Sequence, residues 1–253
     1  MGKADEAVAA ISTPNSRGRV NPAQTAFAAA GFWCYPSAMT LHDGQPVLRG
    51  GTPVENARVA LVLLHGRGST AEDIYALGEE VAADQAGVAI LAPQAADRTW
   101  YPQRFLAPLA QNEPYLSSAL SLVGRLVAEL GQEGLAPANL VLAGFSQGAC
   151  LSLEYAVRHP RRYGGIAGLS GAVIGPPGSP RDLEGGLAGT PVYLGCSDRD
   201  AHIPIASVAE SAELLERLGA KVTKEIFPGM GHTVNADELA ALRQMVSALA
   251  GGG

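Results

Sequence analysis

The segment Gly144-Phe145-Ser146-Gln147-Gly148 carries the clearest chemical signal in the chain, a serine with glycine two residues away on each side. An aliphatic run precedes it and a helical pattern follows it, which is the context of a nucleophile elbow. The glycines let a strand turn sharply into a helix with Ser146 at the tip, where free N–H groups of the helix face a reacting carbonyl. A glycine-rich turn without chemistry is the alternative, and the flanking strand and helix favour the catalytic interpretation.

A serine hydroxyl is a poor nucleophile near neutral pH, so Ser146 requires a base. His232 lies in the loop that follows the last predicted strand, directly after residues 228–231, and is the predicted base. The other four histidines are excluded as the base. His42 and His65 lie before the serine, and His159 lies about 20 Å away at the far end of the helix that Ser146 starts. His202 is too close in sequence to the candidate acids.

The acid of a triad is expected between the serine and the histidine, in a loop that follows a strand. Asp198 and Asp200 both lie in such a loop. One carboxylate would orient His232 and stabilise its imidazolium, and the other would be a loop or capping carboxylate. The spacing to the predicted helix start at Pro204 favours Asp200 as the acid.

Two backbone donors are needed to stabilise the oxyanion of a tetrahedral intermediate. The N–H of Gln147 is one candidate, and the N–H of Arg67, in the glycine-containing loop 65–69, is the other. His65 is interpreted as a structural residue that pins this loop. The sequence has no HExxH motif, no histidine pair at helical spacing and no phosphate-loop motif, so neither a metal nor a cofactor is expected.

The segment 98–108 concentrates aromatic residues in a chain that is only 6% aromatic. These side chains form either a small separate core under a long loop or the wall of an acyl or alcohol pocket. The second interpretation makes Trp100 and Phe105 the predicted substrate-binding residues. Cys150, on the helix after the serine, is interpreted as a buried small hydrophobic residue and not as a reactive thiol.

From residue 58 onward, short aliphatic runs alternate with helical patterns. Runs without polar alternation that are separated by helices predict a mostly parallel sheet covered on both faces, an α/β fold. Strands are predicted at 59–64, 88–91, 140–143, 166–169, 192–194 and 222–227, and helices at 71–85, 115–130, from 146 to about 159, 204–218 and 237–249. Residues 1–55 do not share this rhythm and are predicted to form an N-terminal extension packed on a catalytic domain of residues 56–253.

Four motifs occur together in this order: LLHGRG at 63–68, GFSQG at 144–148, DAHIP at 200–204 and GMGH at 229–232. With them the chain resembles the phospholipase/carboxylesterase family of α/β-hydrolases, which includes the acyl-protein thioesterases and small bacterial carboxylesterases. The resemblance covers about residues 59–249 and implies an α/β-hydrolase fold without a large lid. Where the family has proline directly after the acid, this chain has Ala201.

The resemblance also implies roles for five residues: Ser146, Asp200 and His232 as the triad, with Arg67 and Gln147 as oxyanion-hole donors. The expected function is that of a serine carboxylesterase that hydrolyses soluble carboxylic esters of short to medium acyl length through an acyl-enzyme. An acyl thioesterase and a lysophospholipase would use the same machinery. A binding module that has kept the fold without catalysis is the alternative from another class.

Composition limits the partners of the chain. The formal net charge is −6 and there is no basic cluster beyond Arg161-Arg162, which argues against a nucleic-acid partner. The longest apolar run is about six residues, far below the ~20 of a membrane helix, so membrane insertion is not expected. The three scattered cysteines favour a reducing cytoplasm, the predicted partner is a small-molecule ester, and the sequence allows a homodimer.

Overall fold

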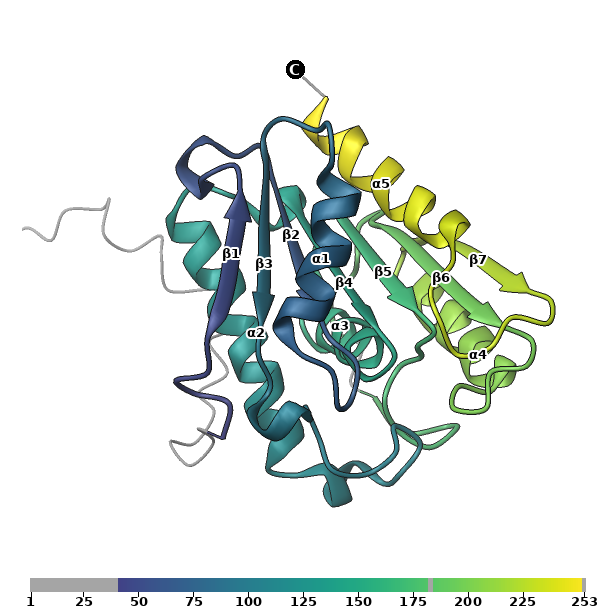
Figure 1. The fold of residues 1–253 in the computed structure, drawn as a ribbon. Helices are drawn as coiled ribbons and strands as arrows, with labels where there is room; N and C mark the ends of the chain where they lie inside the picture. Colours follow the sequence, from purple (N-terminus) through teal and green to yellow (C-terminus); the bar gives the residue numbers. More distant parts are fainter. Residues whose placement is uncertain (1–40, 182–183, 252–253) are drawn as a thin grey trace, which may run out of the picture. The chain divides into compact units, whose positions relative to one another are not determined.

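The computed structural model describes residues 41–181 and 184–251, and in them a seven-stranded sheet has the order β1-β3-β2-β4-β5-β6-β7 (Figure 1). Neighbouring strands are parallel, except that β1 runs antiparallel to β3. The strands are β1 (Val47–Gly51), β2 (Val59–Leu64), β3 (Val88–Pro93), β4 (Leu140–Phe145), β5 (Gly165–Leu169), β6 (Pro191–Ser197) and β7 (Lys221–Phe227).

Five α-helices of the described residues cover the two faces of this sheet: α1 (Ala71–Ala82), α2 (Tyr115–Gln132), α3 (Gln147–Arg158), α4 (Ile205–Arg217) and α5 (Ala236–Ala250). Short 3-10 helices occupy Val54–Asn56, Ala96–Arg98, Leu109–Asn112 and Pro137–Asn139. Alternate residues of the buried strand β2 enter two separate cores. One core contains α2, α3 and α4, and the other contains α1 and α5. The predicted α/β-hydrolase fold with helices on both faces is therefore confirmed.

The strand β1 lies inside the segment that the sequence pattern assigned to an N-terminal extension. Val47 pairs with Pro93 and Gly51 with Ala89, so this part of the segment is an edge strand of the sheet. A Cβ at Gly50 would lie 1.8 Å from the Tyr75 hydroxyl of α1, so a larger residue there would require the Tyr75 side chain to move. Residues 1–40 lie outside the described part of the chain, and the division into 1–55 and 56–253 stays a prediction.

The six parallel strands bring their carboxyl ends to one edge of the sheet, which is where α/β proteins bind their ligands. The segments after β2, β3, β4, β6 and β7 carry the predicted site residues and all leave from this edge. In residues 41–181 and 184–251, no helix has the length and apolar character to cross a membrane.

Helix α5 begins directly after the loop of His232 and is fixed by a capping box. The Asn235 side chain accepts a hydrogen bond from the Glu238 N–H, and the Glu238 carboxylate accepts one from the Asn235 N–H. The second carboxyl oxygen of Glu238 is buried without a hydrogen-bond partner among the described residues. It lies against Gly195, where a Cβ would be only 2.3 Å away.

Burial, together with the nearby carboxylates of Glu225 and Asp200, raises the pKa of Glu238 to about 7 from an ordinary value of 4.5. Between these two pH values the folded protein holds a proton that the unfolded chain releases. The free energy of unfolding therefore falls as the pH rises through this window. Glu238→Gln keeps the capping oxygen but removes this titration.

We expect Glu238→Gln to be ~1–3 kcal/mol more stable than the parent near pH 8, and to lose this advantage near pH 5. Urea unfolding at both pH values measures the difference. Asp237→Asn is the matched control, because Asp237 is an exposed carboxylate in the same turn of α5. A constant difference between Glu238→Gln and the parent at both pH values would contradict the assignment.

Candidate active site

Ser146 joins β4 to α3 in a backbone conformation that few L-residues adopt, with φ 55° and ψ −116°. The turn is possible because its glycine neighbours lack side chains. A Cβ at Gly144 would lie 2.4 Å from the Gly148 carbonyl carbon, and one at Gly148 would lie 2.0 Å from the Leu64 oxygen at the end of β2. The backbone N–H of Ser146 donates to Leu169 O at 2.9 Å, which fixes the turn against β5.

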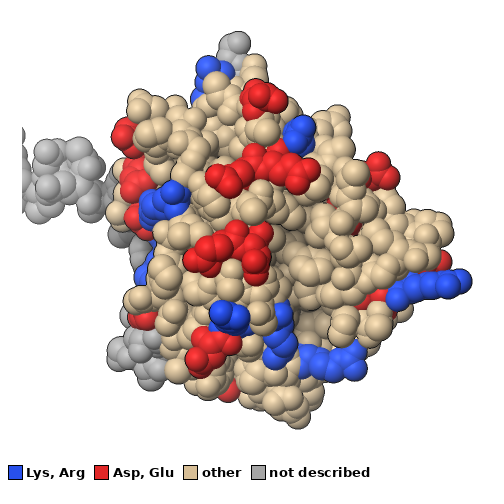
Figure 2. All heavy atoms as spheres, in the orientation of Figure 1, with Lys and Arg blue, Asp and Glu red and all other residues tan. Residues whose placement is uncertain are grey.

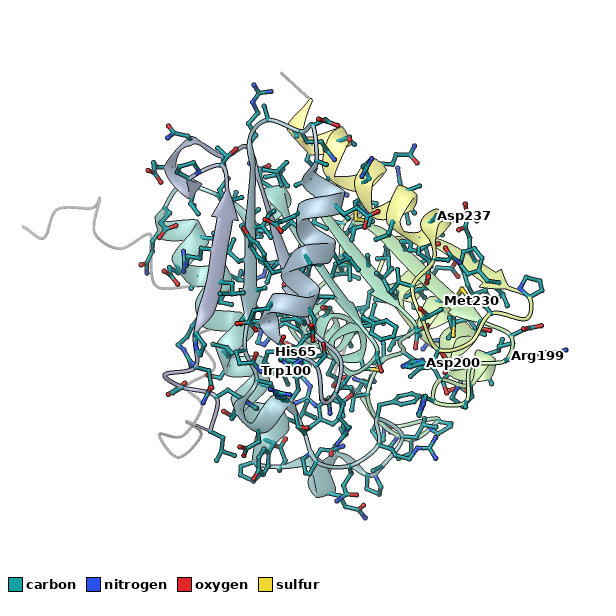
Figure 3. All side chains as sticks on the ribbon, viewed as in Figure 1. His65, Trp100, Arg199, Asp200, Met230 and Asp237 are labelled. Atoms are coloured by element: carbon teal, nitrogen blue, oxygen red, sulfur yellow. The ribbon has the colours of Figure 1, made fainter. Side chains whose placement is uncertain are left out.

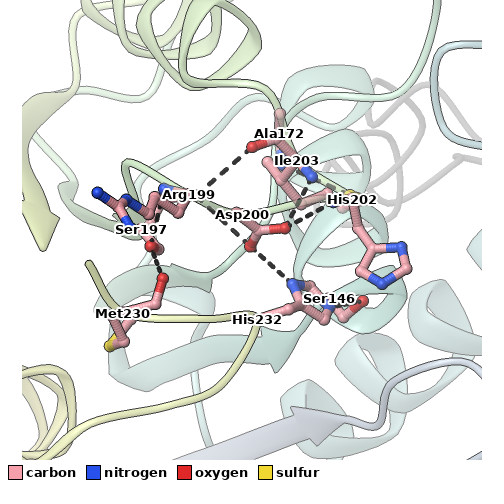
Figure 4. A network of polar contacts seen from close by, with 11 residues as sticks. Ser146, Ala172, Ser197, Arg199, Asp200, His202, Ile203, Met230 and His232 are labelled. Atoms are coloured by element: carbon pink, nitrogen blue, oxygen red, sulfur yellow. Dashed lines mark hydrogen bonds and ion pairs between the residues drawn. The ribbon is translucent and has the colours of Figure 1, made fainter. Parts of the chain in front are cut away.

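Ser146, His232 and Asp200 form a continuous chain of hydrogen bonds at the carboxyl edge of the sheet (Figure 4). His232 Nε2 lies 2.8 Å from Ser146 Oγ, and His232 Nδ1 lies 2.6 Å from Asp200 Oδ2. The carboxylate can only accept at neutral pH, so Nδ1 carries the proton and Nε2 accepts from the serine hydroxyl. This is the geometry in which the imidazole can take up the serine proton.

The Asp200 carboxylate is inaccessible to solvent and has three donors besides a weak thiol contact. Oδ1 accepts from the backbone N–H groups of His202 at 2.8 Å and Ile203 at 3.0 Å, while Oδ2 faces His232. Burial alone would raise the pKa of Asp200, but these hydrogen bonds outweigh it and lower the pKa below its ordinary value. Asp200 is therefore ionised and able to stabilise a positive charge on His232.

Asp198 and Ser197 join the loop of the acid to the loop of the histidine. Asp198 Oδ1 accepts from the Gly229 N–H at 2.6 Å. Ser197 Oγ donates to the Met230 carbonyl and accepts from the Arg199 N–H at 3.0 Å (Figure 4). The structure thus separates the two candidate acids, because Asp200 contacts the imidazole and Asp198 holds the backbone of the neighbouring loop.

The backbone N–H groups of Arg67 and Gln147 have no acceptor among the described residues, as donors to a substrate oxygen require. Gln147 is the first residue of α3, so its N–H points out of the helix end. The loop of Arg67 is held by His65, whose Nε2 accepts from the Ala95 N–H at 3.0 Å. His65 Nδ1 then donates to Gly66 O at 2.7 Å, and burial lowers the pKa of His65, so this residue is a neutral structural anchor.

The Gln147 side chain has a role that the sequence pattern did not indicate. Its Oε1 accepts from the Trp100 N–H at 2.9 Å, and its Nε2 donates to Tyr101 O at 2.7 Å. The residue beside the nucleophile therefore also positions the segment that follows β3. The position next to Ser146 was visible in the sequence, but the partner of a glutamine amide depends on which loop the fold brings near it.

Trp100 is fully buried and does not line the cavity at Ser146. Its indole N–H donates to His65 O at 2.8 Å, and its ring packs against that of His65, beside which Figure 3 labels it. The Trp100 ring also packs against that of His42. The prediction that Trp100 contacts the substrate is therefore corrected. Its side chain instead packs beneath the cavity and holds the backbone of His65, at the start of the Arg67 loop. The adjacent Tyr101, which the aromatic cluster contained but the prediction did not select, lines the cavity instead.

A cavity of about 400 Å³ opens at Ser146 and His232. Its apolar wall contains Tyr101, Phe105, Cys150 and Ile203, so Phe105 lies where it was predicted. Burial raises the pKa of the Cys150 thiol to about 12, which leaves it protonated and unreactive. His202 also lines the cavity, with its ring centroid 4.7 Å from that of His232.

The structure thus brings five of the seven predicted site residues to the lining of one cavity: Arg67, Phe105, Ser146, Gln147 and His232. Asp200 does not line the cavity but contacts His232 at 2.6 Å, and Trp100 is buried away from it. Within the part of the chain that the structure describes, no group of three or more His, Cys, Asp or Glu side chains could hold a metal ion.

The fold and the order of these residues define an α/β-hydrolase. The model of the phospholipase/carboxylesterase family matches residues 51–250, so the chain belongs to this family and the predicted resemblance is confirmed. A solved phospholipase/carboxylesterase from Dyadobacter fermentans is 41% identical, with a TM-score of 0.74 over 80% of this chain and 96% of that one. The esterase PE8 structure is 27% identical, with a TM-score of 0.65 over 81% and 98%.

Curated relatives match over shorter stretches. The acyl-protein thioesterase 1 of Kluyveromyces lactis is 30% identical over 135 residues, which are 52% of this chain and 59% of that protein. The acyl-protein thioesterase 1 of Gibberella zeae is 34% identical over 119 residues, or 45% and 49%. The matched part of the chain spans about half the length of these relatives.

We expect Trp100→Ala to lower the free energy of unfolding by ~3–5 kcal/mol, because the substitution empties a fully buried site and leaves His65 O without its donor. Chemical denaturation measures the loss. Phe105→Ala is the comparison, since its side chain borders the cavity. A Trp100→Ala variant with parent stability but an altered preference for substrate length would restore the predicted substrate contact.

Proposed function

We propose that the protein is a serine hydrolase that cleaves carboxylic esters through an acyl-enzyme. The observation that carries this proposal is the chain of hydrogen bonds from Ser146 through His232 to Asp200, with distances of 2.8 and 2.6 Å. A structural network would not require the serine to be in a strained conformation at the end of a cavity.

In the first step, Ser146 Oγ attacks the ester carbonyl carbon while its proton passes to His232 Nε2. Asp200 holds the opposite ring nitrogen and stabilises the imidazolium. The carbonyl oxygen becomes an oxyanion, which the N–H groups of Arg67 and Gln147 stabilise by hydrogen bonds. His232 then gives its proton to the leaving alcohol, and the acyl group stays on Ser146.

In the second step, water replaces the alcohol. His232 takes a proton from the water as it attacks the acyl carbonyl, and the same N–H groups stabilise the second oxyanion. Collapse of this intermediate returns the proton to Ser146 Oγ and releases the carboxylic acid. His232 thus acts as the base when the nucleophile attacks and as the acid when the leaving group departs. The proposed reaction needs no other general acid or base.

The size of the cavity supports small esters. A volume of about 400 Å³ is at the lower end of the range of ligand pockets. Its apolar wall at Tyr101, Phe105 and Ile203 would add ~0.8 kcal/mol of binding free energy for each buried CH₂ group until the space is filled. We therefore propose short to medium acyl chains.

Thioesters are the second candidate substrates, because curated relatives from fungi bear the name acyl-protein thioesterase. Their acyl group would transfer to Ser146 in the same way, with a thiol as the leaving group. The cytoplasmic location and the homodimer stay predictions from the sequence.

We expect kcat/KM for p-nitrophenyl esters to rise with acyl length and then fall within a series of about two to about sixteen carbons. Ser146→Ala should abolish turnover and labelling by a fluorophosphonate probe. Acyl thioesters of the same lengths, run beside the esters, identify the preferred leaving group. A parent protein that neither turns over esters nor forms the covalent adduct would be a binding module, and activity that peaks at the longest chains would contradict the proposed substrate size.

We expect Asp200→Asn to lower kcat by up to ~10⁴, because an amide at this position favours the wrong tautomer of His232. Asp198→Asn is the matched control: the amide keeps an oxygen that can accept from the Gly229 N–H, so its loss should be far smaller. Steady-state kinetics with one ester, and melting temperatures for both variants, make the comparison. If Asp198→Asn is the more damaged variant, Asp200 is not the acid.

A further inference from the structure

Two arginine side chains, those of Arg67 and Arg104, line the active-site cavity, and no carboxylate is among its described lining residues. This is unusual in a chain with 18 basic and 24 acidic side chains, where chance would favour carboxylates. Figure 2 shows Lys and Arg side chains beside a hollow in the lower part of the view, with Asp or Glu side chains next to them on one side.

The Arg67 guanidinium is fixed across the mouth of the cavity by neutral groups. It donates to the carbonyl oxygens of Pro102 at 2.7 Å and Gln103 at 2.5 Å. Its central carbon lies 5.9 Å from the centre of the Tyr101 ring. Carbonyl oxygens satisfy the N–H donors but do not cancel the charge, so the cation remains uncompensated.

Arg104 presents a free side chain from a fixed backbone. The fully buried Asn112 side chain accepts from the Gln103 N–H at 2.8 Å and donates to Arg104 O at 3.3 Å. The next residue, Phe105, accepts from the Gly175 N–H at 2.7 Å. In the described residues, the Arg104 guanidinium itself has no hydrogen bond, ion pair or ring contact.

We propose that these two arginines form a subsite for a carboxylate group of the substrate, so that the favoured esters carry a negative charge away from the ester bond. This inference rests on the proposed ester hydrolysis and specifies its substrate class. Arg67, held in place, supplies a fixed positive field, and Arg104 supplies donors that can pair with both oxygens of a carboxylate.

The size of the effect follows from the exposure of the two side chains, since both arginines are exposed and their interactions are partly screened. We therefore expect a preference of roughly twofold to fivefold in kcat/KM for a charged ester over its neutral counterpart, and not a complete exclusion of neutral esters. The preference should shrink as ionic strength rises from about 0.01 M to about 1 M, because the screening length falls from about 30 Å to about 3 Å.

The experiment uses two matched pairs of esters. In the first pair the charge is on the acyl side: mono-p-nitrophenyl adipate against p-nitrophenyl heptanoate. In the second pair it is on the alcohol side: 4-(butanoyloxy)benzoate against its N-methylamide, which is neutral and has the same single ester bond. The ratio of kcat/KM within each pair reports the preference, and the pair with the larger ratio identifies which end of the substrate meets the arginines.

Arg104→Gln should lower the larger ratio, with the remaining preference supplied by Arg67, whereas Arg161→Gln should leave the ratio unchanged. Arg161 is the matched control because it is an exposed arginine at the opposite edge of the sheet, between α3 and β5. Ratios of one or less in the parent, or a ratio that Arg104→Gln does not lower, would overturn the subsite while ester hydrolysis stands. Failure to hydrolyse any of the four esters would overturn both proposals.

Discussion

The site depends on the close approach of α3 to the end of β2. Gly148 lies so near the Leu64 carbonyl that no side chain fits between them. This contact places the first turn of α3 against the end of β2, so the elements that carry the two candidate oxyanion donors are brought together. It also forces the sharp turn that holds Ser146 at a positive φ.

The acid and the base depend on a second pair of neighbours. Strands β6 and β7 are paired along seven positions, from Pro191 with Lys221 to Ser197 with Phe227. The two loops therefore start level with each other, and the contacts of Ser197 and Asp198 keep them level beyond the strand ends. A hydrogen bond between Asp200 and His232 needs this agreement in register, because an imidazole has little freedom to follow a displaced carboxylate.

The sequence was sufficient to predict the elements whose signals are local. Local sequence is enough to recognise buried strands without polar alternation and the glycines around Ser146. The order of residues along the chain is enough to eliminate four histidines.

β1 was not predicted, because an edge strand that is half exposed and ends in glycines resembles a turn. Trp100 was assigned to the wrong surface for a related reason: an aromatic side chain after a strand can point into a cavity or beneath it, and only the partner of its N–H decides. The unpaired state of Arg104 likewise depends on which carboxylates the fold brings near, which no spacing encodes.

The anchoring of segment 100–112 has a consequence for attempts to redesign specificity. The Gln147 side chain hydrogen-bonds to the backbone of Trp100 and Tyr101 at the start of this segment. The Asn112 side chain hydrogen-bonds to the backbone of Gln103 and Arg104. This segment is thus attached at defined points, which include Phe105 O through the Gly175 N–H, and insertions between residues 106 and 111 would leave these attachments in place. If segment 100–112 is replaced by the equivalent segment of a related hydrolase, residue 147 has to be exchanged with it, because one end of the segment is hydrogen-bonded to the side chain beside the nucleophile.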